Sequence, residues 1–560
     1  MRLRKIKIKE YRTLKNFTLD CIGGAEETKD YTLHLIVGVN GTGKSTLLRL
    51  LARLFLQLKN EQQRNPPFGF VVSYQLKQND EEKVISITNL DEEGNHISGS
   101  EGLYIRRETI AQYETGDHES YVPFDATQHT NDLPPRIIAF TTGNEEEWIE
   151  ALQFEDQSDN GDDEELQFPD PEQPGYQDAL KEWYLQELPG TPIEDEKADD
   201  TQKTEEIRTD HFYFLSAEQI PLVALCGMLV DMKDASTTES SSQWRYLSNI
   251  MQESRIKALN GFSLRLRMNK EALLEPDKGF IQELLKLATH TIQIGSDYLL
   301  VFDLLAKKTL PNDLLALRGG GGFLFFSSLA RLAQAREQNE QLLQEVNLFL
   351  ERSQEQEERD ELGASVEQPP LHLFTWLSDG EQSFLGRLCL MPLLRESEAL
   401  ILLDEPEVHF NDYWKQQLVF MLDESLTIPQ DRPKPQPCHA LMTTHSSITL
   451  TDVVNTNILI LKRRNGYTYE TIPTSLETLG ADPSDIIVSV FGARHAAGAN
   501  GVNRIKQKLE SIRKIASEWQ QLPSNIKNQC IKDLENLEKQ VGPGYWRFLI
   551  LRQIHDLRGR

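Results

Sequence analysis

The segment Gly38-Val-Asn-Gly-Thr-Gly-Lys44-Ser45 matches the pattern G-x-x-x-x-G-K-[ST] at every position. The apolar stretch from His34 to Val37 precedes it, and apolar residues at helical spacing follow from Leu47 to Phe55. This order predicts a strand, a glycine-rich turn and a helix. Glycines let successive backbone N–H groups turn toward phosphate oxygens, and the helix N-terminus adds positive potential. The segment is therefore predicted to hold nucleotide phosphates, and an ordinary glycine turn is the weaker alternative.

Two side chains of this loop carry specific chemistry. Lys44 is expected to reach the β- and γ-phosphates, and the Ser45 hydroxyl is expected to bind Mg²⁺. The predicted nucleotide-binding set is Gly38, Asn40, Gly41, Thr42, Gly43, Lys44, Ser45 and Thr46.

A second candidate site segment is the apolar run from Ala399 to Leu403, which ends in Asp404 and Glu405. A buried parallel strand that delivers an aspartate at its carboxyl end can hold a magnesium ion, and the following glutamate can polarise a water. Alone, such a pair could equally be a capped turn. Together with the phosphate loop it predicts Asp404 as a metal ligand and Glu405 as the catalytic base.

Two further segments each carry candidate residues. Ser378 and Gly380 precede a predicted helix from Glu381 to Leu394, whose free N–H groups suit a γ-phosphate. A plain N-cap is the alternative. His445 ends the short apolar stretch that begins at Ala440, where a purely structural histidine is the alternative.

The order of these four segments is that of an ABC-type ATPase, and the sequence resembles that family at all four points. The resemblance implies ATP and Mg²⁺ as cofactors, and Glu405, His445 and Lys44 as catalytic residues. It also implies a head-to-head homodimer or a higher oligomer, because in the family the Ser-x-Gly segment reaches the nucleotide of the partner subunit. The chain departs from the family at Asn411, where an aspartate is usual. The glutamine that normally follows the sheet of the first lobe is left unassigned.

The motif Asp-Glu-Pro-Glu-x-His at residues 404–409, together with the opening from Ile6 to Phe17, resembles the soluble branch that includes RecF and the SMC proteins. In that branch Arg12 would lie near the nucleotide, and a solvated arginine on an edge strand is the alternative. The insert and the helical C-terminus look most like the ATPase subunits of Septu-type, retron-linked or restriction-associated antiphage defence systems.

The predicted fold is α/β, an ABC-type head with a mixed sheet, an acidic insert, a helical insertion and a helical C-terminal domain. The expected boundaries are 1–142 for the N-terminal lobe of the head, 143–209 for an exposed acidic insert, 210–370 for a helical insertion with a short coiled-coil-like helix, 371–480 for the C-terminal lobe and 481–560 for a helical partner-binding region. Residues 145–173 hold thirteen acidic residues and no basic one, which favours exposure.

Composition excludes several classes of protein. The 59 Lys+Arg against 87 Asp+Glu give a formal charge of −28, which argues against a surface that coats nucleic acid throughout and leaves a local basic site open. The longest apolar runs fall short of the roughly 20 residues of a membrane span. The first nine residues alternate basic and apolar side chains where a secretion signal would be apolar. No membrane partner and a cytoplasmic location are therefore expected.

Three functions fit these observations. The favoured one is a regulatory ATPase that controls a separate nuclease, expected to be of the HNH type. The alternatives are a RecF-like DNA-repair ATPase and, less favoured, an ATPase with its own nuclease, for which no metal-binding carboxylate cluster follows Pro473. The apolar stretches 487–492 and 545–551 are candidate docks for the nuclease or candidate core. The cations Lys506, Lys508, Arg513 and Lys514 are expected to form a solvated helix face.

Overall fold

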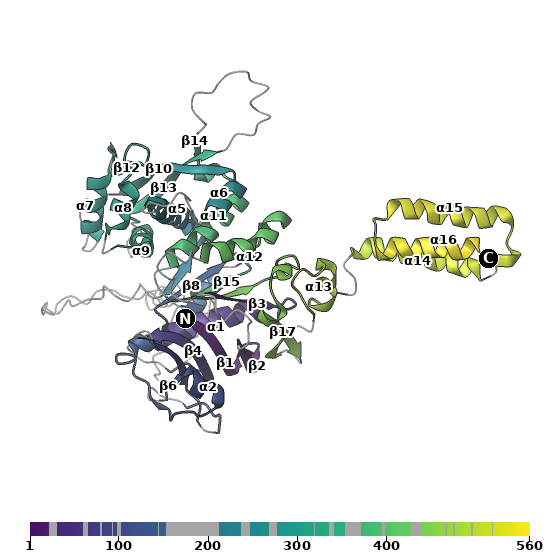
Figure 1. Cartoon of the computed structure of the whole chain (residues 1–560), viewed down its shortest axis with the longest axis horizontal. Helices are drawn as coiled ribbons and strands as arrows, with labels where there is room; N and C mark the ends of the chain where they lie inside the picture. The colour runs from purple at the N-terminus through teal and green to yellow at the C-terminus, as the bar shows by residue number, and fades with distance from the viewer. Residues whose placement is uncertain are drawn as a thin grey trace, which may run out of the picture.

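The computed structural model describes most of the chain outside the acidic insert (Figure 1). The described ranges are 1–21, 31–59, 65–78, 81–91, 93–97, 102–143, 145–152, 212–236, 247–267, 277–317, 320–334, 341–352, 371–394, 398–426, 438–464, 467–473, 476–493, 497–517 and 519–559. The region 153–211, most of the predicted acidic insert, lies outside them.

Within these ranges thirteen strands form one sheet, in the order β7-β6-β5-β4-β1-β2-β18-β17-β3-β16-β15-β8-β9. The strands are β1 (Arg2–Tyr11), β2 (Leu14–Asp20), β3 (Tyr31–Val37), β4 (Phe70–Gln78), β5 (Glu81–Thr88), β6 (Tyr104–Thr109), β7 (Val122–Pro123), β8 (Arg136–Thr141), β9 (Phe212–Leu215), β15 (Ala399–Asp404), β16 (Cys438–Thr443), β17 (Ile458–Arg464) and β18 (Tyr467–Pro473). The predicted α/β class is confirmed.

The half of the sheet from β17 to β9 is parallel, and its carboxyl ends form one edge. Asp404 pairs in register with Thr443 of β16 and with Thr141 of β8, and Thr443 pairs with Ile36 of β3. The strand β15 is buried along its whole length, as its continuous apolar sequence requires. This register brings the end of β15 beside the loop that follows β3.

Helices cover both faces of this parallel half. On one face α1 (Lys44–Lys59) packs with Ile36, Leu402 and Leu441. On the other, α5 (Ile220–Ser236), α11 (Asp379–Leu394) and α12 (Asp412–Leu426) pack with Ile401 and Met442. Neighbouring residues of one strand therefore point into different cores, which is the alternation expected of a sheet between two helical layers.

The predicted helical insertion at 210–370 is wrong in part. Its described residues hold helices together with a second, antiparallel sheet in the order β11-β12-β10-β13-β14. These strands are β10 (Ile256–Arg267), β11 (His290–Ile294), β12 (Asp297–Asp303), β13 (Leu343–Arg352) and β14 (Leu371–Leu373). The helices are α6 (Ser248–Glu253), α7 (Asp277–Leu287), α8 (Leu310–Leu315) and α9 (Gly322–Ala333).

The short coiled-coil-like helix expected in this insertion, on the basis of an a/d-like seam of apolar residues between Leu329 and Phe349, is also wrong. Helix α9 ends at Ala333, and the seam beyond it is the strand β13, in which Leu348 and Leu350 are buried in alternation. Short apolar runs fit periods of 3.5 and 2 equally well, so only the cross-strand partners decide. Leu348 pairs with Phe262, whose ring stacks on Phe302 of β12 at 4.5 Å between centroids.

The first residues of the predicted acidic insert are not fully exposed. Residues Glu145–Leu152 form helix α3, which packs on α1. Trp148 is only 1% exposed and belongs to the core of the head, and Glu147 forms an ion pair with Arg49 of α1. One large aromatic side chain thus anchors the start of a strongly acidic sequence.

The helical C-terminal region is confirmed. After α13 (Pro483–Ser489), the helices α14 (Ala499–Ala516), α15 (Ser524–Gln540) and α16 (Tyr545–Arg558) form a bundle with its own core, which contains Leu509, Leu534 and Ile550. Figure 1 shows this bundle projecting from the head. In the described part of the chain no helix is long and apolar enough to cross a membrane.

Candidate nucleotide site

The phosphate loop lies between β3 and α1, as its sequence predicts. Gly41 and Gly43 have φ of +78° and +84°, a region that side chains other than glycine rarely enter. A Cβ on Gly38 would stand 2.7 Å from Thr42 Oγ1 and 2.8 Å from the Leu461 carbonyl oxygen. Glycine is therefore required at these three positions by conformation or by space.

Lys44 is buried at the first position of α1. Its Nζ donates to the Gly38 carbonyl oxygen at 3.2 Å, across the mouth of the loop. Burial lowers the pKa of Lys44, and the carboxylates of Glu405, Asp404 and Glu407 act in the opposite direction. Nucleotide phosphates would supply further negative charge at this position.

Asp404 and Ser45, two predicted metal ligands, lie side by side. The Ser45 hydroxyl donates to Asp404 Oδ1 at 2.9 Å, and Thr443 Oγ1 donates to the same oxygen at 2.7 Å. Thr141 Oγ1 contacts the other oxygen, Oδ2, at 3.3 Å. A hydroxyl and a carboxylate at the end of the phosphate loop are hard oxygen ligands of the kind that Mg²⁺ requires, so the residues present fit this ion.

Glu405, the predicted base, stands at the turn after β15 with φ of +51°. Its Oε1 lies 3.2 Å from Nε2 of His445, and the hydrogen bond from His445 is the main cause that lowers the pKa of Glu405. Lys44 lowers this pKa further. A non-glycine residue in the left-handed region costs roughly 1 kcal/mol and is typical of functional sites.

Glu407 is a site residue to which the sequence pattern gave no role. It is 4% exposed, and its Oε1 accepts hydrogen bonds from the Thr444 hydroxyl and, at 3.1 Å, from the backbone N–H of His445. Burial raises the pKa of Glu407. The only sequence signal for Glu407 was its position as the second glutamate of the motif at 404–409. Its hydrogen bonds to Thr444 and His445 identify it as a support for His445.

Two threonines lie at the end of β8, the last strand of the predicted N-terminal lobe, and the glutamine expected after this lobe stays unassigned. Strand β8 ends at Thr141, and the Thr142 hydroxyl donates to the Glu405 carbonyl oxygen at 2.8 Å. The Thr142 backbone N–H also donates to the Asp404 carbonyl oxygen at 3.3 Å. These bonds tie the end of β8 to the two carboxylate residues.

The described contacts of Ser378 and Gly380 do not include the phosphate loop of the same chain. The described contacts of Ser378 are a reciprocal cap with Glu381, in which Ser378 N–H donates to the carboxylate at 2.9 Å. A Cβ on Gly380 would stand 3.0 Å from the His409 carbonyl oxygen. Asn411, in the same loop, accepts a hydrogen bond from Trp414 N–H at 2.8 Å and so caps α12.

Arg12 lies in the β1–β2 turn, which rests on the phosphate loop through its neighbour Thr13. A Cβ on Gly43 would stand 2.7 Å from Thr13 Oγ1. The Arg12 side chain itself is exposed beside the Tyr11 ring. Arg463 of β17, which the sequence gave no reason to select, donates to the Gly41 carbonyl oxygen at 3.2 Å.

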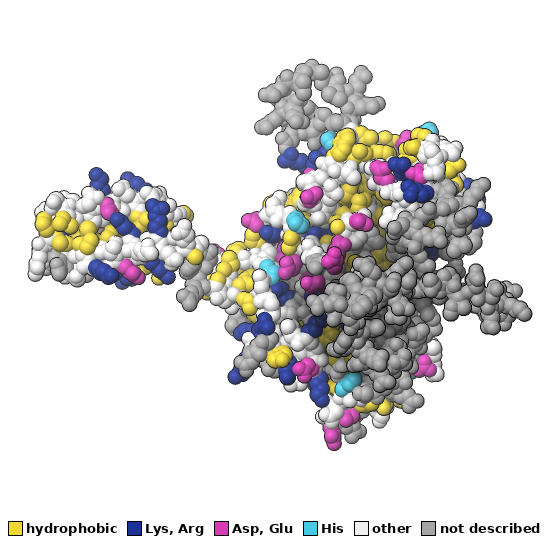
Figure 2. Space-filling model, turned by 180° about the vertical axis from the view of Figure 1, so that it is seen from behind, with side chains coloured by type: hydrophobic (Ala, Val, Ile, Leu, Met, Phe, Trp, Pro, Cys, Tyr) yellow, Lys and Arg dark blue, Asp and Glu magenta, His cyan; other side chains and the backbone are white. Residues whose placement is uncertain are grey.

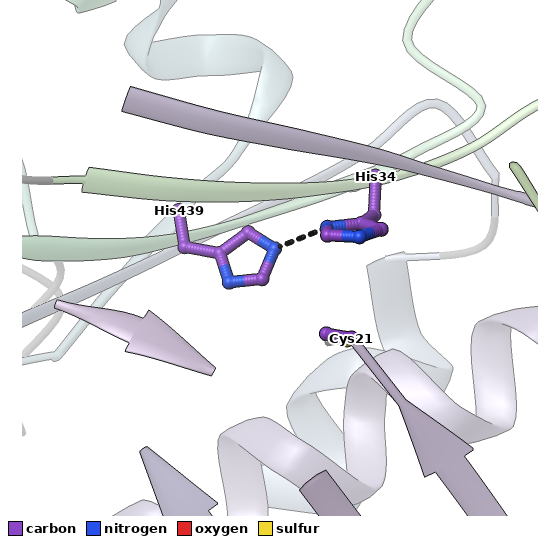
Figure 3. Close-up of side chains that lie close together, drawn as sticks. All are labelled: Cys21, His34 and His439. Carbon is purple, nitrogen blue, oxygen red and sulfur yellow. Dashed lines mark hydrogen bonds between the residues drawn. The ribbon is translucent and has the colours of Figure 1, made fainter. Parts of the chain in front are cut away.

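A second cluster of chemical side chains, Cys21, His34 and His439, is buried in the sheet near the N-terminus (Figure 3). Leu3 N–H donates to His439 Nδ1 at 2.8 Å, so neutral His439 carries its proton on Nε2 and donates to His34 Nδ1 at 2.9 Å. Two nitrogens on one tetrahedral zinc ion would stand roughly 3.3 Å apart. Burial also raises the pKa of the Cys21 thiol. The trio therefore fits a hydrogen-bonded core pair better than a metal centre.

Comparison with known proteins gives one family match. Residues 1–253 match the model of an AAA ATPase domain, a range that contains the phosphate loop and ends before Asp404. A search of curated proteins found no match.

Among solved structures, the SMC head domain from Thermotoga maritima aligns with 85% of this chain and 100% of its own, at 10% identity and a TM-score of 0.32. The family match agrees with the loop geometry described above. The match of residues 1–253 to an AAA ATPase domain implies ATP hydrolysis.

Proposed function

We propose that the chain is an ABC-type regulatory ATPase of an antiphage defence complex and that it controls a separate nuclease. The observation that carries the ATPase mechanism is the junction of Ser45, Asp404 and Glu405 at one edge of the sheet. Residues 359 positions apart in sequence meet there through a single hydrogen bond.

In the proposed reaction, ATP binds with its phosphates on the backbone N–H groups of residues 38–46 and on Lys44. Ser45 and Asp404 would hold Mg²⁺, which supplies charge neutralisation on the phosphates when bound. Glu405 accepts a proton from the attacking water, and its lowered pKa keeps it ionised for this step. His445 holds the Glu405 carboxylate in place and stands ready to contact the γ-phosphate.

The proposed active unit is a homodimer. Ser378 and Gly380 lie on the N-terminus of α11, and their described contacts are with α11, the 405–411 loop and α12. A Ser-x-Gly segment placed this way would complete the site of a second head rather than its own. ATP between two heads would then fix the relative positions of the two C-terminal bundles, which is how nucleotide state could control a bound nuclease.

The nuclease partner rests on resemblance in sequence and on the exposed apolar side chain of Val488 on α13. A RecF-like repair ATPase is the second candidate, favoured by the same motif at 404–409. Affinity purification from the native host separates the two, since a co-purifying nuclease supports the first, and repair or replication proteins support the second.

The ATPase assignment is tested by two variants. Lys44→Ala should lose ATP binding, whereas Glu405→Gln should keep ATP binding and reduce turnover by roughly 10²–10⁴-fold, the contribution of a general base. Lys286→Ala, on the exposed face of α7, is the matched control. Wild-type turnover by Glu405→Gln would remove Glu405 as the base.

A further inference from the structure

The C-terminal bundle differs sharply in charge from the rest of the chain. Residues 499–560 contain twelve Lys+Arg and six Asp+Glu, a formal charge of +6, while the whole chain carries −28. The remaining 498 residues therefore carry −34. A basic module on an acidic protein is the electrostatic pattern of a local polyanion site.

Most of these cations have no acidic partner among the described residues of the bundle. Three bases pair with the acids Asp533, Glu538 and Glu535. Within the described residues, seven exposed cations of the bundle have no acidic partner: Arg504, Lys506, Arg513, Lys514, Lys532, Lys539 and Arg552. Their positive charge is therefore available to an anionic ligand. The interpretation of these cations as a solvated helix face assigns this charge no function.

A groove between α14 and α15 is lined by side chains of the kind that donate hydrogen bonds to phosphodiester oxygens. Its polar lining includes Arg504, Gln507, Lys508, Ser511, Asn536 and Gln540, all of which carry hydrogen-bond donors. Its single acid, Asp533, is already bound by Lys508 at 2.7 Å and by Gln529 at 2.7 Å. The groove therefore favours an anion over a cation.

Aromatic side chains adjoin the basic ones on the other side of α14. Lys506 Nζ lies 5.5 Å from the centroid of the Trp546 ring, and Tyr545 contacts that ring at 5.3 Å between centroids. Tyr545 and Phe548 are 67% and 59% exposed. Figure 2 shows hydrophobic and basic side chains together on the visible face of the bundle.

We propose that the C-terminal bundle binds single-stranded nucleic acid that crosses α14, with Arg504 on one side of the helix and Lys506 on the other contacting phosphates and Tyr545 as a stacking platform. Exposed aromatic rings beside unpaired cations favour a single strand, whose bases can stack, over a duplex or an acidic protein. The site is separate from the nucleotide site and does not depend on the identity of the nuclease partner.

The test uses the full-length protein and fluorescent single strands of about 20 nucleotides, one of DNA and one of RNA, with a duplex of the same length. The double variant Arg504→Glu/Lys506→Glu should weaken single-strand binding at least about tenfold at low salt. It should also reduce the slope of log affinity against log salt by roughly 1.4, since each lost phosphate contact contributes about 0.7.

Tyr545→Ala should weaken binding and leave that salt slope unchanged, because stacking releases no counterions. The matched control is Lys278→Glu/Lys286→Glu, which makes the same change in charge on the exposed face of α7. ATP hydrolysis at the wild-type rate shows that each variant is folded.

Absence of binding at low salt, equal loss in the control variant, or tighter binding of duplex than of single strand would each overturn the proposal. Binding of DNA or RNA alone would identify the type of strand and support it.

Discussion

His445 Nε2 lies 3.2 Å from Glu405 Oε1, at the point where two neighbouring parallel strands end. The backbone of His445 is also fixed in position, because its N–H donates to the buried carboxylate of Glu407. The base and its orienting group thus belong to one hydrogen-bonded unit that spans β15 and β16. Such a unit allows a change in His445 to be read in the pH dependence of Glu405.

The first prediction concerns this pair. The hydrogen bond from His445 is the largest cause that lowers the pKa of Glu405, so His445→Ala should raise that pKa. A carboxylate with a higher pKa protonates at higher pH, and the acidic limb of the kcat profile should move upward. We also expect kcat at pH 7.5 to fall roughly 10²-fold, the scale for loss of one positioned donor. An unshifted acidic limb in the variant would contradict the role of the pair.

The second prediction concerns Glu407 as a positioning residue. Glu407→Ala should lower kcat and leave KM for ATP nearly unchanged, because it frees the Thr444–His445 turn without touching the nucleotide loop. Glu407→Gln keeps an acceptor oxygen for the Thr444 hydroxyl and His445 N–H, and should retain most activity. Steady-state kinetics of the two variants distinguish them, and equal loss in both would point to a role for the negative charge.

The third prediction tests the dimer. Ser378→Arg should abolish hydrolysis and leave ATP binding intact, as should Glu405→Gln. If each site combines Glu405 of one head with Ser378 of the other, a mixed dimer of the two variants contains one intact site. An equal mixture should recover about a quarter of wild-type activity, since half of the dimers are mixed and each has one working site. No recovery after exchange of subunits, verified by light scattering, would argue for sites built within one chain.

Much of the site was predictable because its chemistry lies in short, contiguous motifs. Residues 38–45 could be selected because the phosphate-loop motif is specific, and Asp404 and Glu405 could be selected because a phosphate loop in the same sequence gives carboxylates at a strand end a function. Thr141, Thr142, Glu407 and Arg463 could not, because their roles come only from contacts between strand ends and loops that lie from 38 to 422 positions apart in sequence.

The fold of the insertion at 210–370 was harder to predict from the sequence, for a physical reason. Residues 343–350 mix apolar and polar side chains, and the spacing of the apolar ones fits a helix or a strand. The choice depends on pairing with β10, which precedes it by some eighty residues. The segment around Trp148 was difficult for a different reason. Its acidic composition predicts exposure, whereas burial of the single Trp148 side chain fixes helix α3 on the head.

The fourth prediction concerns pH and stability. Burial lowers the pKa of His34 to about 4 and that of His439 well below its ordinary 6.5. When pH falls below 6.5, the unfolded chain takes up protons that the folded chain does not, so stability is lost from pH 6.5 down to about 4. Between pH 7.5 and 5.5 His34 alone should cost about 1.3 kcal/mol.

This loss can be measured by urea unfolding at the two pH values. His34→Gln keeps an oxygen acceptor for His439 and should show a smaller difference between them. His290→Gln makes the same change on an exposed strand and should keep the wild-type difference. A His34→Gln protein with an unreduced difference would refute the neutral histidine pair.

The order of strands in the large sheet also has a consequence for how the protein is made. Strand β3 stands between β16 and β17, which are synthesised some four hundred residues later. Until the ribosome has translated β15, β16 and β17, strand β3 lacks both of its neighbours in the sheet. The phosphate loop that follows β3 then also lacks Asp404 and His445. Nascent chains should therefore be unable to hold Mg²⁺-ATP until translation is well past residue 445, and fragments that end near residue 253 should bind it poorly. ATP should therefore stabilise the assembled head and not its precursors.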